Sequence, residues 1–387
     1  MSDVVARAAR LATGLAARAA EHDVAATFPE QDIAELRAEG LLGLMVPTDS
    51  GGLGAGFVEY CAVAMALARG SGATALLFNM HASVTGALAG VTPELASALG
   101  AGPEFAAERR TVLRNAADGA LYAVAISEAA VGSQLSKLTT SYERRGAGYH
   151  LCGTKVACSG AGHADAYLVA ARDSRTSEAV ISYFLVPSGP GVVVRTGWDP
   201  LGMRATASHG IEIDVEVPAR ALLGVEGVSV LLAYTMPQWL VASYAAVYAG
   251  VAIAAVEEAA IYLNGRPGTP HTAVRHRLGR ADAAARAAAA VVERAGRAVD
   301  EAPGDPETNR WIYRAKLVAG DAVMEVAAGV AEACGLGALS RGSPIERIFR
   351  DARLAAVMPP RSDLCADYLG ATAVGLDPRA TMEVPPW

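Results

Sequence analysis

A loop of small residues carries the clearest chemical signal in this chain of 387 residues. From Ser127 to Ser133 it reads SEAAVGS, in which one carboxylate, Glu128, is flanked only by small side chains. Because small side chains leave backbone amides and hydroxyl groups accessible, such a loop can approach a large flat or phosphorylated ligand closely. The loop therefore predicts a binding site for a ligand of that kind.

Composition argues against several other kinds of chemistry. The five cysteines are scattered, without a CxxC pair or a His/Cys cluster at metal-ligand spacing, so we expect neither a metal site nor a disulfide framework. A net charge of -7 without a basic cluster argues against a nucleic-acid partner. Charged residues, glycines and prolines interrupt the apolar segments, and the N-terminal stretch does not read as a secretory signal. We therefore expect a cytoplasmic protein without a membrane span.

The elements around the loop predict an α+β protein that is mostly α. Residues 1–120 read as a helical domain with short connections. Pro29 near the start of one helix and Gly40 after its end follow the usual asymmetry of helix termini. The helices expected in this domain are 4–22, 30–39, 57–69, 74–88, 93–99 and 105–115.

Residues 121–225 read as a β domain, and residues 226–387 return to helices. In the β domain, short β-rich runs alternate with glycine turns, as in an antiparallel barrel or sandwich. Alternation of Ile211, Ile213 and Val215 predicts a half-buried strand that Pro218 ends. Apolar residues at helical spacing and short connectors then predict an up-down bundle, with helices expected at 231–264, 271–300, 307–334, 345–357 and 362–372.

Two motifs in the β domain resemble those of the acyl-CoA dehydrogenase family of flavoproteins. Ser127-Glu128 and Gly132-Ser133-Gln134 are similar to the family's Thr-Glu and Gly-x-Gly-Ser-Asp signature, and GTKVACS at 153–159 is similar to its second signature. The turn GGLG at 51–54 resembles a pattern in the family's first domain. The resemblance covers nearly the whole chain. It implies a helical N-terminal domain (1–120), a middle β-barrel domain (121–225) and a C-terminal four-helix bundle (226–387).

The resemblance implies FAD as the cofactor. Ser159 takes the place of a family threonine that hydrogen-bonds the flavin ring, and it keeps the hydroxyl group. The family tryptophan that covers the edge of the flavin is Ala157 here, which implies a more open edge. The residues expected along the ring and pyrophosphate are Val124, Ile126, Ser127, Gly132, Ser133, Cys158 and Ser159.

The adenosine side of FAD is expected at the C-terminal bundle. Arg266 matches an arginine that reaches the FAD pyrophosphate of a neighbouring subunit, and a guanidinium fork can donate two hydrogen bonds to a diphosphate. The family glutamine near the adenine is replaced by Glu332, and Arg277, Gly335 and Leu336 complete the expected contacts. This arrangement implies a homotetramer or homodimer.

The family also needs a carboxylate base, and neither usual position carries one. Its dehydrogenases remove a proton alpha to a thioester carbonyl, which requires a base beside the substrate. Those positions hold Pro359, after the Arg-Asp-Ala-Arg segment at 350–353, and Leu240. Asp363, His81 and Glu128 are the candidate replacements. The residues expected to contact the substrate are Ser133, His81 and Arg361.

Three functions stay open at this point. The chain resembles an FAD-dependent dehydrogenase of acyl thioesters, carried on CoA or on a carrier protein, that would use a non-standard base. It could instead host a flavin-dependent oxygenase reaction, or be the non-catalytic subunit of a heteromeric dehydrogenase. The implied electron acceptor is an electron-transfer flavoprotein or molecular oxygen.

Overall fold

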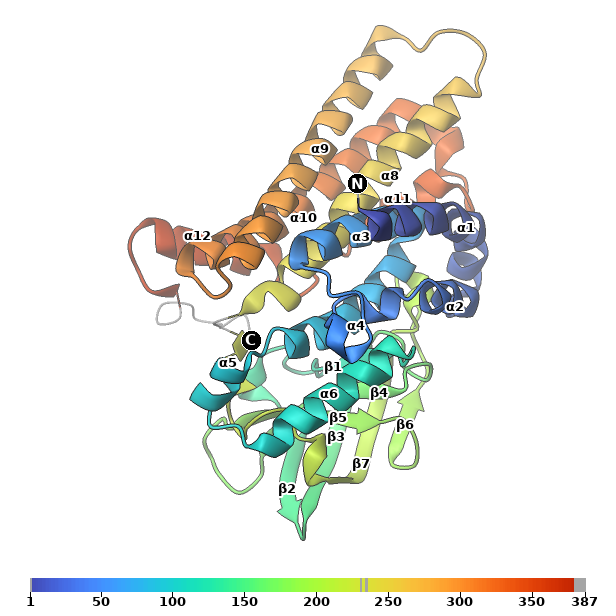
Figure 1. Cartoon of the computed structure of the whole chain (residues 1–387). Coiled ribbons are helices and arrows are strands. Elements are labelled where there is room, and N and C mark those ends of the chain that lie inside the picture. Colours follow the sequence, from blue (N-terminus) through green and yellow to red (C-terminus); the bar gives the residue numbers. More distant parts are fainter. Residues whose placement is uncertain (1, 230–231, 234–235, 379–387) are drawn as a thin grey trace.

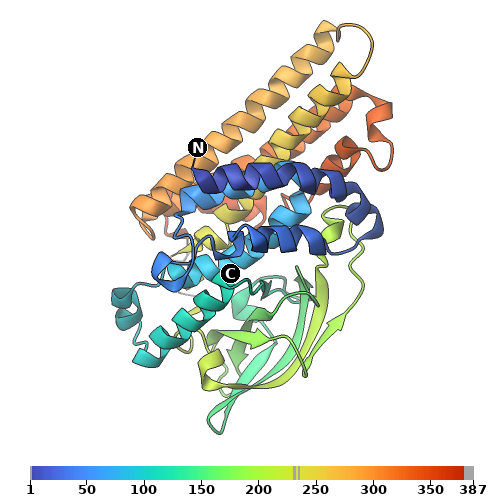
Figure 2. The same cartoon turned by 45° about the vertical axis from the view of Figure 1, so that its right-hand side comes forward.

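A computed structural model describes residues 2–229, 232–233 and 236–378 of the chain. Its seven strands lie at one end of the molecule, the N-terminal helices lie in the middle, and the long C-terminal helices extend from the other end (Figure 1). Seen from a second direction, the first helices again run between the sheet and the long helices (Figure 2). The predicted order of helical domain, β domain and helical bundle is therefore confirmed.

The N-terminal domain is built around α4 (Gly72–Ala89), a helix that contains no Asp, Glu, Lys or Arg. Ser71 caps it by accepting a hydrogen bond from the backbone N–H of Thr74 at 3.2 Å. Nearly all of its side chains are buried, because β1, α3 and α8 all pack against it. The helices of this domain are α1 (Asp3–Ala25), α2 (Glu30–Ala38), α3 (Phe57–Gly70), α4 (Gly72–Ala89), α5 (Pro93–Ala98) and α6 (Pro103–Ala117).

The glycine turn at 51–54 has a structural role. A Cβ atom at Gly52 would lie 2.2 Å from the carbonyl oxygen of Val46, so only glycine fits at this position. Gly51 and Gly54 have φ angles of 89° and 64°, a region that glycine adopts readily.

The sheet has the order β1-β4-β2-β3-β7-β6. Strand β5 lies outside this order and pairs with β4. Along β7, Ile211, Ile213 and Val217 are buried while the residues between them are more exposed, which confirms the predicted half-buried strand. The strand ends at Pro218 as expected. The strands are β1 (Tyr122–Ala125), β2 (Ser141–Arg145), β3 (Gly148–Cys158), β4 (Ala166–Asp173), β5 (Ile181–Pro187), β6 (Val192–Arg195) and β7 (His209–Pro218).

Strand β1 joins two hydrophobic cores. Ala123 and Ala125 pack into the core of the β domain. Val124 and Ile126 point the other way and pack into the large core shared by the helices. Because alternate residues of a strand face opposite sides, β1 places part of the motif region at the junction between the domains.

Two helices of the C-terminal bundle differ from the prediction, one at its start and the other at its end. The helix expected from residue 231 begins at Ala242, after a short 3-10 turn, η6 (Pro237–Trp239). Pro237 has no N–H to donate, which favours the first position of that turn over the interior of a longer helix; residues 230–231 and 234–235 lie outside the described residues. The helix expected to reach residue 357 ends at Ala352. The bundle contains α8 (Ala242–Asn264), α9 (Thr272–Glu301), α10 (Pro306–Cys334), α11 (Pro344–Ala352) and α12 (Ser362–Ala373).

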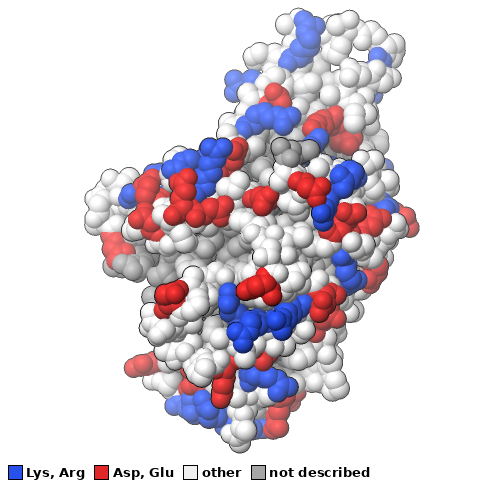
Figure 3. All heavy atoms as spheres, viewed as in Figure 1, with Lys and Arg blue, Asp and Glu red and all other residues white. Residues whose placement is uncertain are grey.

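One helical stretch, Pro237–Asn264, is long and apolar enough to cross a membrane by length and composition alone. Of its apolar window, 89% is buried inside the molecule, which is the environment of a core helix. On the face of the molecule shown in Figure 3, side chains of both charge signs are interspersed.

Candidate active site

A cavity lies where the β domain meets the helices. Its walls come from β1, the loop after β1, the end of β3, the segment before β7, α4, the start of α8 and the segment after α11. Among the described residues that line it, none carries a carboxylate or a basic group. The lining residues are Leu76, Met80, Val124, Ile126, Ser127, Ser133, Val156, Ala157, Ser159, Trp198, Met203, Ser208, Leu240, Tyr244, Leu354, Met358 and Pro359.

One wall of this cavity presents a chain of hydroxyl groups. Thr206 Oγ1 donates to the carbonyl oxygen of Met203 at 2.8 Å and lies 2.7 Å from Ser208 Oγ, which lies 2.9 Å from Ser159 Oγ. Since each hydroxyl has a single proton, Ser208 must donate to Thr206, and Ser159 must donate to Ser208. Ser159 therefore has lone pairs that can accept a hydrogen bond from a ligand in the cavity.

A β-bulge brings Ala157 to the same wall. The register between β3 and β7 shifts between Lys155 and Cys158. Ala157 adopts a φ of 54°, a region that non-glycine residues seldom occupy. Val156, its neighbour, donates its backbone N–H to the carbonyl oxygen of Ser127 at 2.9 Å. The bulge thus ties the second motif to the first and places a small side chain at the cavity.

The opposite wall is apolar and contains both positions where the family carries its base. Pro359 and Leu240 line the cavity together with Leu354 and Met358. Tyr244 supplies the one phenol among the described lining residues, and its hydroxyl donates only weakly, to the sulfur of Met80 at 3.7 Å. Burial raises the pKa of Tyr244, so the hydroxyl keeps its proton.

Glu128 is held in a structural ion pair at the base of the loop. Its Oε1 accepts from Lys155 Nζ and from the backbone N–H of Thr140, both at 2.9 Å, and its Oε2 accepts from Thr139. Burial opposes ionisation of Glu128, but the hydrogen bonds from Thr139 and the charge of Lys155 outweigh it and lower the pKa to about 2. A carboxylate held this way is a weak base, and Glu128 does not line the cavity.

The side chain of His81 is also fixed in the core by hydrogen bonds. Its Nδ1 accepts the backbone N–H of Tyr122 at 3.0 Å, so its Nε2 carries the proton that it donates to the carbonyl oxygen of Leu42 at 2.7 Å. Burial lowers the pKa of His81 to about 4. The ring joins α4 to β1 and is not among the residues that line the cavity.

Asp363 and Arg361 lie at the exposed start of α12 and pair with each other. Arg361 donates to both carboxylate oxygens of Asp363, at 3.1 and 2.7 Å. The pair lowers the pKa of Asp363. Neither residue lines the cavity, whereas the nearby Pro359 does.

The structure divides the expected cofactor contacts into two groups. Val124, Ile126, Ser127, Ser133 and Ser159 line the cavity together. Gly132 closes the tight turn of the loop through backbone hydrogen bonds with Glu128. The Cys158 side chain turns into the core of the β domain, where burial raises its pKa to about 12.

The second group lies at the far end of the bundle, outside the cavity. Arg266 stacks over the ring of Tyr262, with its guanidinium carbon 4.5 Å from the ring centre. Arg277 pairs with Glu332 at 3.3 Å. Gly335 ends α10, and Leu336 beside it is 87% exposed.

Several lining residues were not singled out from the sequence. Trp198, Tyr244 and Met358 come from three separate segments that only the folded chain brings together. Met203 lies within a Gly-Met-Arg turn at 202–204, and Ser208 follows this turn by four residues. In that turn Arg204 has a structural role, since it donates to the carbonyl oxygen of Asp23 at 2.8 Å.

A second cavity of about 120 Å³ adjoins the first, and Leu240 lines both. It lies between α4, α5, α6, strands β4 and β5, and the segment that leads to α8. The described residues around it carry no charge. They are Ser83, Val84, Ala87, Leu88, Val91, Ala96, Leu99, Ala101, Phe105, Leu168, Tyr183, Leu223, Gly224, Val225, Val228, Leu232, Ala233, Met236, Trp239 and Leu240.

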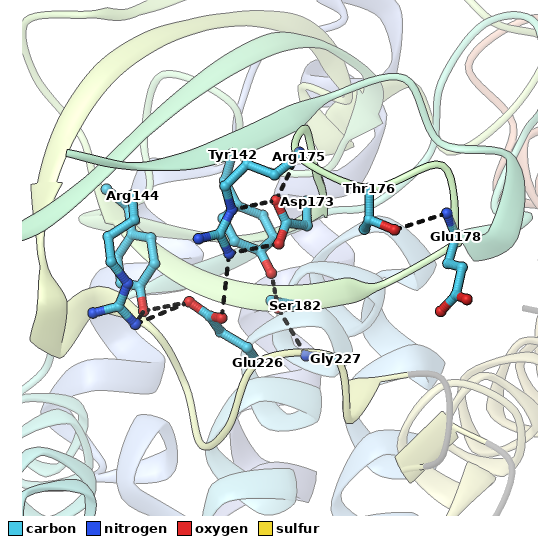
Figure 4. A network of polar contacts seen from close by, with 10 residues as sticks. Tyr142, Arg144, Asp173, Arg175, Thr176, Glu178, Ser182, Glu226 and Gly227 are labelled. Carbon is cyan, nitrogen blue, oxygen red and sulfur yellow. Dashed lines mark hydrogen bonds and ion pairs between the residues drawn. The ribbon is translucent and has the colours of Figure 1, made fainter.

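Glu226 fixes one wall of this second cavity to the β domain (Figure 4). Its Oε1 accepts from Tyr149 Oη at 2.8 Å and from Arg144 at 3.1 Å, and its Oε2 lies 3.7 Å from Arg175. Figure 4 shows Glu226 between the two arginines, on the segment that follows the sheet. The carboxylate thereby holds the residues beside it in the chain, which line the cavity.

Backbone contacts support the same wall. The N–H of Gly227 donates to Ser182 Oγ at 3.0 Å, and Ser182 in turn donates to Tyr142 Oη at 3.0 Å (Figure 4). The N–H of Leu223 donates to the carbonyl oxygen of Tyr183 at 2.8 Å. The segment is therefore attached to β5 on both sides of Glu226.

Comparison with known proteins gives consistent matches along the chain. Residues 3–97, 123–215 and 241–359 match the N-terminal, middle and C-terminal domains of acyl-CoA dehydrogenases. L-evernosamine nitrososynthase from Micromonospora sp. is 31% identical, over 94% of this chain and 88% of that protein. An acyl-CoA dehydrogenase from Bacillus subtilis is 28% identical, over 85% of this chain and 86% of its own.

A solved structure shows the same fold with a flavin bound. FMN-bound TdsC from Paenibacillus sp. A11-2 has a TM-score of 0.84 and is 26% identical, covering 96% of this chain and 97% of that one. The same protein is described as a dibenzothiophene monooxygenase. The relatives of this chain thus include flavin-dependent enzymes with different reactions.

Proposed function

Since this chain belongs to the acyl-CoA dehydrogenase family and its relatives are flavin-dependent oxidoreductases, we propose that it is a flavin-dependent monooxygenase. The observation that carries this proposal is the lining of the cavity between the domains. Pro359 and Leu240 occupy the two base positions, and no described lining residue offers a carboxylate. Removal of a proton alpha to a thioester needs such a base, whereas insertion of an oxygen atom from dioxygen does not.

The residues around the cavity suit a flavin ring. Val124, Ile126 and Met203 provide apolar surfaces, and Ser159 provides a hydrogen-bond acceptor at the end of the hydroxyl chain. An acceptor at this place matches a ring N–H, and a reduced flavin has at least one more N–H than the oxidised form. We infer that the hydroxyl chain favours the reduced flavin.

We favour FMN over FAD as the form that binds. The FAD expected from the sequence needs positive charge for its diphosphate, but Arg277 is paired with Glu332, which adds a negative charge where the family has an amide. Arg266 is stacked on Tyr262. The FMN in the structure of TdsC supports the same choice.

In the proposed reaction, the flavin and the residues of the cavity have separate roles. A reduced flavin supplies two electrons to dioxygen, so that one oxygen atom enters the substrate and the other leaves as water. The apolar wall around Leu240, Leu354 and Met358 keeps bulk water away from the reacting atoms. The Tyr244 hydroxyl, which its raised pKa keeps protonated, can donate a hydrogen bond to an oxygen atom in the cavity.

The proposal is tested by two measurements on one preparation of the full chain with FMN. Anaerobic mixing with butyryl-CoA or octanoyl-CoA is expected to leave the flavin absorbance unchanged. With a flavin reductase, NADH and isotopically labelled dioxygen, a panel of neutral aromatic compounds including indole is expected to yield a product with one labelled oxygen atom. Bleaching by an acyl-CoA would instead establish the dehydrogenase, and failure to bind any flavin would favour a non-catalytic subunit.

A further inference from the structure

The turn before β7 connects the cavity between the domains with helix α11. We propose that Asp351, a residue of α11 outside the cavity lining, positions Met203 in the cavity wall and thereby keeps Ser159 an acceptor for a bound flavin. Asp351 is a positioning residue in this role, because it acts on the flavin only through Met203. The part that concerns flavin rests on the proposed function, whereas the part that concerns Met203 does not.

The carboxylate of Asp351 holds the backbone of Met203 from behind the wall. Its Oδ1 accepts the backbone N–H of Met203 at 2.5 Å, and the whole residue is buried. Arg350 beside it is already paired with Asp23 and Glu346. Burial raises the pKa of Asp351 to about 6, although the N–H of Met203 lowers it. A carboxyl group kept in so unfavourable an environment is typical of a functional site.

Met203 needs this support because of its backbone conformation. Its φ and ψ angles are 52° and 36°, in the left-handed region that is unfavourable for a residue with a Cβ atom. Such a conformation persists only where the surrounding contacts fix it. Loss of the hydrogen bond to Asp351 would free the φ angle of Met203, and rotation about φ would move its carbonyl group.

The carbonyl oxygen of Met203 is the last acceptor of the hydroxyl chain. It accepts from Thr206 Oγ1 at 2.8 Å and from Trp198 Nε1 at 3.3 Å. Because Thr206 donates its proton to this oxygen, it can only accept from Ser208, which in turn accepts from Ser159. Displacement of the oxygen would release the proton of Thr206, and Ser159 could then donate to the cavity. The direction of the chain therefore depends on Met203.

Two further contacts attach this turn to α11. Arg350 donates to the carbonyl oxygen of Leu201 at 3.0 Å. A Cβ atom at Gly202 would lie 2.5 Å from the carbonyl oxygen of Arg350, so the backbones of the turn and the helix are in direct contact. This close approach lets the N–H of Met203 reach Asp351. The C-terminal bundle thus fixes a residue that the β domain presents to the cavity.

The test compares Asp351→Ala with Asp351→Asn in the full chain, because asparagine keeps an oxygen that can accept from Met203. The readout is the preference ratio, the dissociation constant of oxidised FMN in air divided by that of reduced FMN measured anaerobically. Asp351→Ala should lower this ratio about fivefold, as for one hydrogen bond, and Asp351→Asn should stay within about twofold of the wild type. A ratio that is unchanged in Asp351→Ala, or that changes equally in both variants, would overturn the inference.

Matched variants separate this role from a general loss of stability. Asp173 on β4 is also buried and accepts a backbone N–H, from Arg175 at 2.9 Å, but it does not line the cavity. Asp173→Ala should lower stability and leave the preference ratio unchanged. Gly202→Ala pushes the turn away from α11 and should lower the ratio even if Asp351→Ala does not fold. An unchanged ratio in Gly202→Ala, or a lowered one in Asp173→Ala, would contradict the assignment.

NMR of the flavin-free chain with isotope-labelled methionine methyl groups tests the contact with Met203 by itself. The signal of Met203 is assigned by its loss in Met203→Leu. It should shift in Asp351→Ala and keep its position in Asp351→Asn and Asp173→Ala, and an unshifted signal in Asp351→Ala would show that Asp351 does not hold Met203. Because this measurement needs neither flavin nor dioxygen, it decides the role of Asp351 even if the wild type binds no flavin and the proposed function fails.

Discussion

The two cavities that meet at Leu240 differ in how the hydroxyl groups of their lining residues are hydrogen-bonded. In the cavity between the domains, the hydroxyls of Ser159, Ser208 and Thr206 are joined in one directed chain. In the apolar cavity, the hydroxyl of Tyr183 has no partner among the described residues. A directed chain is organised in advance for one constant ligand, whereas an apolar wall without such a chain tolerates ligands that differ in shape. The contrast suggests a fixed cofactor site beside an adaptable substrate site.

The supports of the two cavities also differ. The loop of the proposed cofactor site is anchored by a buried ion pair between Glu128 and Lys155, whose side chains are 5% and 0% exposed. The wall of the apolar cavity is anchored by Glu226, whose side chain is 28% exposed, and by two arginines that are about half exposed. Loss of a buried partner costs far more than loss of an exposed one. The cofactor site should therefore be much more sensitive to mutation of its anchor.

Removal of the buried anchor should give the largest effect. Glu128→Ala leaves the ammonium group of Lys155 buried without its carboxylate, so the free energy of unfolding should fall by about 3–5 kcal/mol. Flavin binding should be lost with it, as followed by denaturant unfolding and by flavin fluorescence. The matched control is Glu143→Ala on β2, whose partially exposed pair with Arg145 should contribute at most about 1 kcal/mol.

A double variant keeps this prediction testable if the single variant does not fold. Replacing the pair with apolar residues, as in Glu128→Leu with Lys155→Met, removes both buried charges together and should recover most of the lost stability. Equal stability of Glu128→Ala and the Glu143→Ala control would show that the ion pair does not support the loop.

The second prediction concerns the wall between α4 and the apolar cavity. A Cβ atom at Gly86 would lie 2.1 Å from the ring of Trp239, so Gly86→Ala must displace that ring. Overpacking of this kind costs about 1–3 kcal/mol. Binding of acetophenone, a neutral aromatic probe of the apolar cavity, should weaken more than tenfold while flavin affinity changes less than twofold. Gly90→Ala, at the residue that follows the end of the same helix, is the control, because the nearest atom to its added Cβ lies at 3.4 Å. Equal loss of both ligands in Gly86→Ala would show that the cavities are not separable.

The third prediction tests the direction of the hydroxyl chain. Ser208→Ala removes the acceptor for the Ser159 proton, so that Ser159 could then donate to the cavity instead of accepting from it. The preference for reduced over oxidised flavin should fall about fivefold, which corresponds to one hydrogen bond of about 1 kcal/mol. The ratio of the two dissociation constants, measured anaerobically and in air, reports this change. A ratio that stays constant while both affinities fall would indicate that Ser208 only supports the wall.

The sequence was sufficient to predict the architecture and part of the first cavity. Helices such as α3 and α10 could be assigned within a few residues, because their apolar spacing and terminal signals are local properties. The start of α8 could not, since Pro237 initiates a separate turn within an apolar run. The motif residues Val124, Ser127 and Ser159 could be grouped from the sequence because two family motifs contain them or adjoin them, and the structure places all three in the lining of one cavity.

The remaining site features depend on contacts between distant segments. His81 and Glu128 are chemically plausible bases in the sequence. Only the folded chain shows that both side chains are already engaged in structural hydrogen bonds. The free hydroxyl of Tyr183 is likewise a property of its surroundings, because tyrosines at other positions of the sheet, such as Tyr149, find partners. No local pattern distinguishes a satisfied polar group from an unsatisfied one.

The smallest effect is expected for Glu226, the exposed anchor of the apolar cavity. Its substitution should change ligand binding in that cavity and leave the cavity between the domains unchanged. Glu226→Gln keeps an oxygen that can accept from Tyr149 but removes the negative charge between Arg144 and Arg175. Exposed ion pairs contribute about 0.2–1 kcal/mol, so the free energy of unfolding should change little. Acetophenone affinity should fall about two- to fivefold at low salt, because the segment around Val225 and Val228 is held less firmly.

Salt dependence separates this electrostatic role from a packing role. Screening weakens the pairs of the wild type, so the difference in acetophenone affinity between wild type and Glu226→Gln should shrink as ionic strength rises. Glu178→Gln provides a control in the same domain, since Glu178 is exposed and its contact with Thr176 involves its backbone N–H and not its carboxylate. Flavin affinity should be the same in all three proteins. A salt-independent loss of acetophenone binding, or a parallel loss of flavin, would mean that Glu226 shapes the domain as a whole and that the two cavities share a single support.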